Sequence, residues 1–100
     1  MTSGGSDTRR GLVMLSEAQR AIKDRGENYG TPLDNFTRIA NLWSVVLGVE
    51  VQPHEVGLCM DLVKTARLIE TPDHYDSWVD KAGYAAATIE CFEKGNTTLD

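Results

Sequence analysis

The chain has 100 residues, of which 41% are hydrophobic and 25% charged, with a formal net charge of −5. This composition is typical of one globular domain and excludes a disordered chain. The acidic balance argues against a nucleic-acid partner, which needs a basic surface, but allows small anionic ligands. No signal peptide or apolar run of membrane-spanning length is present, so we expect a cytoplasmic protein with no membrane partner. We expect both cysteines, Cys59 and Cys91, to be small buried side chains.

The chain begins with a small, polar segment over residues 1–10, which we expect to form a flexible tail. An apolar repeat then predicts a first helix over residues 11–25, ended by Gly26 in a left-handed conformation. The repeat consists of Leu12, Leu15, Ala18 and Ile22.

The second helix is predicted to begin at Thr31-Pro32, because threonine can cap a helix and proline suits its first position. Gly48 ends it. Pro53 begins a third helix in the same manner, and this helix stops near Glu70. Because apolar residues cover two adjacent sides of the third helix, we expect it to be the central helix of the fold. They are Val56, Cys59, Val63 and Ala66 on one side and Leu58, Leu62 and Ile69 on the other.

The last helix is predicted to begin within residues 73–77 and to run to about Glu93. Its short connection to the third helix predicts an antiparallel hairpin. No segment alternates like a strand, so the fold class is all-α, a single four-helix bundle-like domain over residues 11–95. Residues 96–100 are predicted to be a tail.

Two cations and two carboxylates form the first candidate site. In an antiparallel hairpin, Lys64 and Arg67 come level with the region of Asp76 and Asp80. The four groups can form a structural ion network between the helices, or an oligomer contact. Alternatively, the cations bind phosphate while the carboxylates hold magnesium.

The segment RGENYG before the second helix is the second candidate site. Arg25 adds positive charge, Tyr29 can stack on a nucleobase, and the Asn35 amide can both donate and accept hydrogen bonds. The free N–H groups that begin the second helix attract anions. The alternative is an ordinary turn with a packed tyrosine.

Three segments, DRGENYGTPLDNFTRIANLW, PHEVGLCMDLVKTARL and DHYDSWVDKAGYAA, resemble a family of small proteins common in tailed-phage genomes. That family carries a similar Y-G, D-N-F, K-x-x-R and D-x-x-x-D-x-x-G-Y pattern, and the resemblance covers about residues 12–92. The resemblance identifies a family without supplying a function, and the positions that it carries over are Tyr29, Asp34, Asn35, Lys64, Arg67, Asp76, Asp80 and Tyr84.

The pattern is more loosely similar to all-α nucleoside triphosphate pyrophosphohydrolases of the MazG and dimeric dUTPase type. Those enzymes use helical carboxylates to hold magnesium over the phosphates of a nucleotide. The usual E-x-x-E is missing here, and only Asp76 and Asp80 stand in for the following E-x-x-D.

These patterns lead to a hypothesis with two alternatives. The chain binds a nucleotide or nucleotide-derived phosphate, as a magnesium-dependent pyrophosphohydrolase if Asp76 and Asp80 hold the metal. Alternatively, it captures a nucleotide signal without catalysis, as a phage protein acting against host defence in the host cytoplasm, or it is a structural helical oligomer. A homo-oligomer is expected in each case, because the apolar surface exceeds what four short helices can cover. The residues predicted to bind the ligand are Arg25, Tyr29, Asn35, Lys64, Arg67 and Tyr84.

Overall fold

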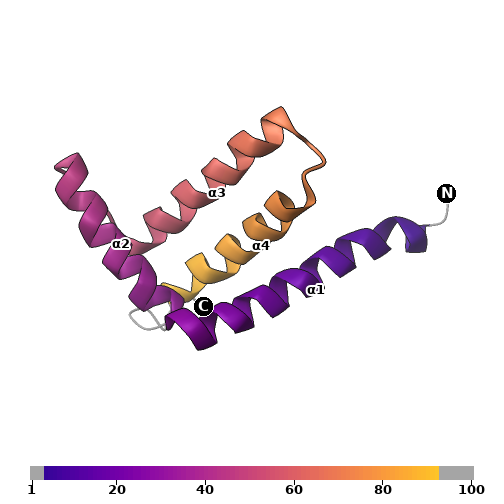
Figure 1. Cartoon of the computed structure of the whole chain (residues 1–100), viewed down its shortest axis with the longest axis horizontal. Helices are drawn as coiled ribbons and strands as arrows, with labels where there is room; N and C mark the ends of the chain where they lie inside the picture. The colour runs from indigo at the N-terminus through magenta and orange to yellow at the C-terminus, as the bar shows by residue number, and fades with distance from the viewer. Residues whose placement is uncertain (1–3, 93–100) are drawn as a thin grey trace.

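The computed structural model describes residues 4–92, apart from the side chains of residues 4–7 and Tyr29. Within these residues the chain forms four α-helices and no strand (Figure 1). None of the described helices is long and apolar enough to cross a membrane. The predicted all-α, four-helix architecture is confirmed. The helices are α1 (Gly4–Tyr29), α2 (Pro32–Leu47), α3 (Pro53–Glu70) and α4 (Tyr75–Glu90).

Local signals set the boundaries of α2 and α3 as predicted. Thr31 caps α2, with its hydroxyl oxygen accepting the backbone N–H of Asp34 at 3.1 Å. Gly48 ends α2 with a φ of 74°, which suits a residue without a Cβ. Pro53 begins α3, and the Glu55 carboxylate accepts a hydrogen bond from the backbone N–H of Gln52 at 2.8 Å. These caps satisfy N–H groups that the helices cannot pair internally.

The first helix is longer than its sequence predicted. It begins at Gly4 rather than Gly11, and it continues through Gly26 to Tyr29. One glycine inside a helix costs only about 1 kcal/mol, so Gly26 does not end α1. The stop lies at Gly30, which has a φ of 85° and precedes the Thr31-Pro32 pair that begins α2.

The prediction that α3 is the central helix is wrong. The helix at the centre is α4, which packs against α1, α2 and α3, whereas α3 packs against α2 and α4. In Figure 1, α4 lies between α1 and α3, and it forms the predicted antiparallel hairpin with α3. Residues 93–95, where the predicted end of the last helix falls, lie outside the described part.

The core lies where α2, α3 and α4 meet. Phe36, Ala40 and Val56 are buried there, and half-buried side chains such as Trp43 and Tyr84 pack around them. Gly57 is also buried, next to Thr88 of α4.

The side of α3 that faces α4 is not the apolar side predicted. Asp61, Lys64 and Thr65 lie on it together with the buried Leu68. As a result, most of the apolar residues expected to be buried point outward, and Cys59 is exposed rather than buried. Of the seven apolar residues predicted to be buried, Val56 is buried, whereas Leu58, Leu62, Val63, Ala66 and Ile69 are exposed together with Cys59.

Candidate functional site

Two ion pairs connect α3 to α4. Lys64 Nζ lies 3.1 Å from an Asp80 carboxylate oxygen, so these two predicted site residues do meet. Lys81 Nζ lies 2.9 Å from an Asp61 carboxylate oxygen. Both carboxylates retain solvent access, with 45% of the Asp80 side chain exposed. Pairs of this exposure typically contribute at most about 1 kcal/mol.

Lys81 is a contact residue that the sequence reasoning missed. Its ammonium also donates a hydrogen bond to Thr65 Oγ1 at 2.6 Å, next to the Asp61 carboxylate. The signal was available, because the hairpin register that places Lys64 beside Asp80 also brings Lys81 within reach of Asp61. The interpretation as a structural ion network between the helices therefore accounts for Lys64 and Asp80, but not for Arg67 and Asp76.

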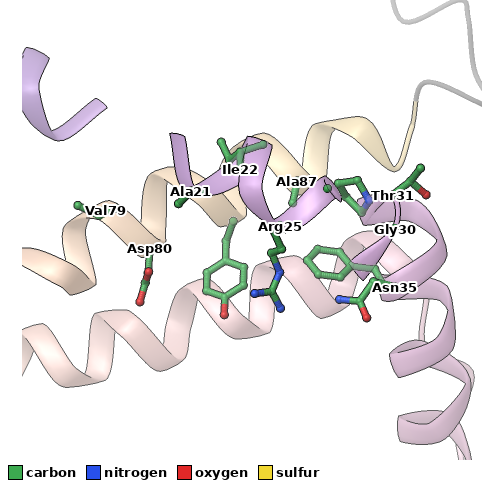
Figure 2. A pocket seen from close by; sticks show the side chains of 14 residues that line it. Ala21, Ile22, Arg25, Gly30, Thr31, Asn35, Val79, Asp80 and Ala87 are labelled. Atoms are coloured by element: carbon green, nitrogen blue, oxygen red, sulfur yellow. The ribbon is translucent and has the colours of Figure 1, made fainter. Parts of the chain in front are cut away.

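A cavity of about 150 Å³ opens to solvent between α1, α2 and α4 (Figure 2). The C-terminal half of α1, the first turns of α2 and the middle of α4 form its walls. Ile22, Phe36 and Val79 give it an apolar lining. A concave, mostly apolar site with a few polar groups is the usual form of a small-molecule site.

Four predicted site residues line this cavity: Arg25, Asn35, Asp80 and Tyr84. In the view of Figure 2, the side chains of Asp80, Arg25 and Asn35 follow one another along the cavity and point to the same side. Arg25 and Asn35 came from the segment around the second helix start, and Asp80 and Tyr84 from the last helix. The structure therefore brings Asp80 of the first candidate site to the same cavity as Arg25 and Asn35 of the second.

Two local features shape the cavity. Gly83 lines it, and no atom lies within 4 Å of the position that a Cβ would occupy there. The missing side chain thus leaves room at the α4 wall of the cavity. Thr31 and Pro32 bring the N-terminal end of α2 to the cavity, where the helix dipole favours negative charge.

The remaining predicted residues lie elsewhere. Arg67 and Asp76 are exposed, line no part of the cavity and form no ion pair with other described residues. Asp76 precedes Asp80 by one turn, and the α4 wall of the cavity begins only at Val79. Lys64 does not line the cavity, but it forms an ion pair with Asp80, which does. The Tyr29 side chain lies outside the described part of the chain.

The donor set for a metal is small. Within the described part of the chain, no three His, Cys, Asp or Glu side chains gather closely enough to hold an ion. Of the two aspartates predicted to bind magnesium, Asp80 lines the cavity and is paired with Lys64.

Two groups outside the cavity have shifted acidities. Burial, with a contribution from the neighbouring Glu90 charge, raises the pKa of the Cys91 thiol. Desolvation raises the pKa of the Tyr75 hydroxyl, and the nearby Glu17 carboxylate raises it further. Neither shift reports on ligand binding at the cavity.

Comparison with known proteins places the cavity within a shared region. Residues 13–92 match the model of a family described as a domain of unknown function, DUF6378. The Gene 55 protein of Mycobacterium phage D29 is 43% identical over 82 residues, covering 81% of this chain and 54% of that protein. The Gene 55 protein of Mycobacterium phage L5 is 42% identical over 76 residues, covering 74% and 49% respectively. This chain thus spans about half the length of the curated relatives it matches, and no solved structure matches it significantly.

Proposed function

The chain belongs to the DUF6378 family of phage proteins, and from this premise we propose that its α1–α2–α4 cavity binds a nucleotide or nucleotide-derived phosphate. The observation that carries the proposal is the convergence of Arg25, Asn35, Asp80 and Tyr84 on one cavity.

The charges around the cavity suit an anionic group. The Arg25 guanidinium offers a planar fork that matches phosphate oxygens. Asp80 would repel a phosphate, but Lys64 at 3.1 Å compensates its charge. The N-terminal end of α2 adds a favourable dipole. Together these groups allow an anion to bind despite the acidic balance of the whole chain.

The other lining residues suit a base or a sugar. The rings of Tyr84 and Phe36 provide flat apolar surface, and the Asn35 amide can donate and accept hydrogen bonds. A cavity of about 150 Å³ is smaller than the roughly 300–1,000 Å³ of ordinary ligand pockets. We therefore expect it to hold one part of the nucleotide, with the remainder lying in the open mouth.

A thermal-shift screen against nucleoside triphosphates, cyclic nucleotides and ADP-ribose tests the proposal. A ligand at about 100 times its Kd stabilises the folded state by about 2.7 kcal/mol. Arg25→Gln should remove most of this stabilisation, whereas Arg20→Gln, on an exposed part of the same helix that does not line the cavity, should leave it unchanged. Equal responses of the two variants, or no response to any nucleotide, would contradict the proposal.

Catalysis is the second question about the same cavity. Incubation with nucleoside triphosphates and magnesium, followed by assay of pyrophosphate, separates an enzyme from a binder. Pyrophosphate release that Asp80→Asn abolishes would support the pyrophosphohydrolase form of the proposal. Recovery of a bound, unaltered nucleotide would support the non-catalytic form, in which the protein captures a nucleotide signal against host defence. Of the two aspartates predicted to hold magnesium, Asp80 lines the cavity and Asp76 does not. We therefore favour the binding form over the catalytic form.

A further inference from the structure

A second, open cleft lies between the first half of α1 and the beginning of α4. Its volume is about 320 Å³, which falls within the roughly 300–1,000 Å³ of ordinary ligand pockets. It shares no lining residue with the α1–α2–α4 cavity. We call it the aromatic cleft; its lining residues are Arg10, Gly11, Met14, Asp73, Tyr75 and Trp78.

The aromatic side chains of the cleft offer flat apolar surface to a ligand. Trp78 is 44% exposed, although its indole N–H donates a hydrogen bond to the Pro72 carbonyl oxygen at 2.9 Å. This bond restrains the ring and satisfies its polar atom, so the part left for a ligand is the apolar ring surface. Tyr75 and the half-buried Met14 add a second ring and a polarizable thioether. Exposed aromatic rings of this kind are the surfaces on which nucleobases stack.

Gly11 keeps the α1 wall of the cleft open. It lies within α1, where alanine is the better helix former. No atom lies within 4 Å of the position that its Cβ would occupy, so close packing does not require a glycine there. The missing side chain leaves room for a flat ring to enter from solvent.

The two charged residues that line the cleft match the polar edge of guanine. An arginine can donate two hydrogen bonds to guanine O6 and N7, whereas adenine carries an N–H₂ donor in place of O6. A carboxylate such as that of Asp73 can accept the N1–H and N2–H₂ groups of guanine. Neither Arg10 nor Asp73 forms an ion pair with another described residue, so both can bind a ligand.

The charges around the cleft favour the base over a phosphate. Besides desolvation, the carboxylates of Glu17 and Asp76 raise the pKa of the Tyr75 hydroxyl, so both carboxylates lie near the cleft. Together with Asp73 they outnumber the one cation of the lining, Arg10. A phosphate would be repelled there, whereas an uncharged base would not.

We propose that the aromatic cleft binds a guanine base, stacked on Trp78 and Tyr75 and hydrogen-bonded at its edge to the two charged lining residues. This proposal is independent of nucleotide binding at the α1–α2–α4 cavity.

Tryptophan fluorescence of a Trp43→Phe variant tests the proposal. The chain has two tryptophans, so this variant reports on Trp78 alone. Guanosine, which carries no phosphate, should quench the fluorescence in a saturable manner, after correction for its own absorption. Adenosine and cytidine should bind roughly fivefold more weakly or worse, because they lack the acceptors and donors that the cleft pairs with.

Two matched pairs of variants locate the binding. Arg9 and Arg10 are adjacent exposed arginines, of which Arg10 lines the cleft. Arg10→Gln should weaken guanosine binding by roughly fivefold or more, and Arg9→Gln should leave it unchanged. Asp73→Asn and Asp76→Asn form the same comparison on the other wall, where Asp73 is the lining residue.

Equilibrium dialysis of guanosine against the chain with Trp43 in place keeps the proposal testable if Trp43→Phe does not fold. Gly11→Leu, which fills the cleft, should abolish this binding, whereas Arg25→Gln in the α1–α2–α4 cavity should not change it. Equal binding of the nucleosides, equal responses within either matched pair, or no saturable binding would overturn the proposal. A preference for tetramethylammonium over guanosine would overturn it as well, because aromatic rings near carboxylates also suit cations.

Discussion

Because α3 closely approaches α4 at Gly57, we expect glycine-to-alanine substitution to have opposite effects on stability at Gly57 and at Gly83. A Cβ on Gly57 would overlap Thr88 Oγ1 and lie 3.0 Å from Thr88 Cβ and 3.1 Å from Phe36 Cε2. Overpacking of this kind typically costs about 1–3 kcal/mol. Replacing a helical glycine with alanine returns about 0.5–1 kcal/mol. We therefore expect Gly57→Ala to lower the free energy of unfolding by about 1–2 kcal/mol.

Gly83→Ala is the matched control within α4. A Cβ at Gly83 would meet no atom within 4 Å, so only the helix-propensity gain applies. This variant should raise the free energy of unfolding by about 0.5–1 kcal/mol. The two alanine variants should thus differ by about 1.5–3 kcal/mol.

Urea unfolding followed by circular dichroism, at one fixed protein concentration, measures this difference. A fixed concentration matters because association would shift the apparent stability. Adding Thr88→Ala to Gly57→Ala should recover part of the loss, since it removes the overlapping hydroxyl. If Gly57→Ala were as stable as Gly83→Ala, the packing of α3 on α4 described above would be refuted.

Three further predictions concern single side chains. Asp80→Ala should cost at most about 1 kcal/mol in urea unfolding, because 45% of this side chain is exposed; a loss of several kcal/mol would instead indicate a sealed ion network. Ser44→Ala should lower the free energy of unfolding by about 1–2 kcal/mol, because it leaves the part-buried Val51 N–H without its 2.8 Å acceptor; no loss would contradict that contact. In a Cys59→Ala variant, alkylation of Cys91 should rise at a higher pH than that of free cysteine, because burial raises its pKa and disfavours the thiolate; a midpoint at or below that of free cysteine would contradict this.

Four residues that line the cavity were predicted from the sequence, but their arrangement around one cavity was not. Arg25 and Asn35 were singled out because their side chains suit an anionic or nucleotide ligand, Asp80 as a predicted magnesium ligand, and Tyr84 through the resemblance to the phage family. They were assigned to two separate places, since hairpin register relates only neighbouring helices. Only the packing of α1 and α2 against α4 brings them together.

Arg67 shows that spacing along one helix does not predict which residues contact a neighbouring helix. It follows Lys64 by three residues, and residues at that spacing are neighbours on a helix surface. Yet Lys64 meets α4 while Arg67 remains exposed. The edge of a helix contact depends on the crossing geometry of the two helices, which spacing along one helix does not specify.

The sequence by itself determined the four-helix, all-α fold and the start of α2 and of α3. Thr31-Pro32, Gly48 and Pro53 act within one turn of their own position, through caps and fixed backbone angles that need no distant partner. The tertiary structure alone decided which side of α3 is buried. That helix is apolar on two sides, yet the side that packs against α4 carries the Lys64–Asp80 and Asp61–Lys81 pairs. Apart from the buried Val56, the residues of its two apolar sides face outward, because burial depends on where partner helices lie and not on periodicity alone.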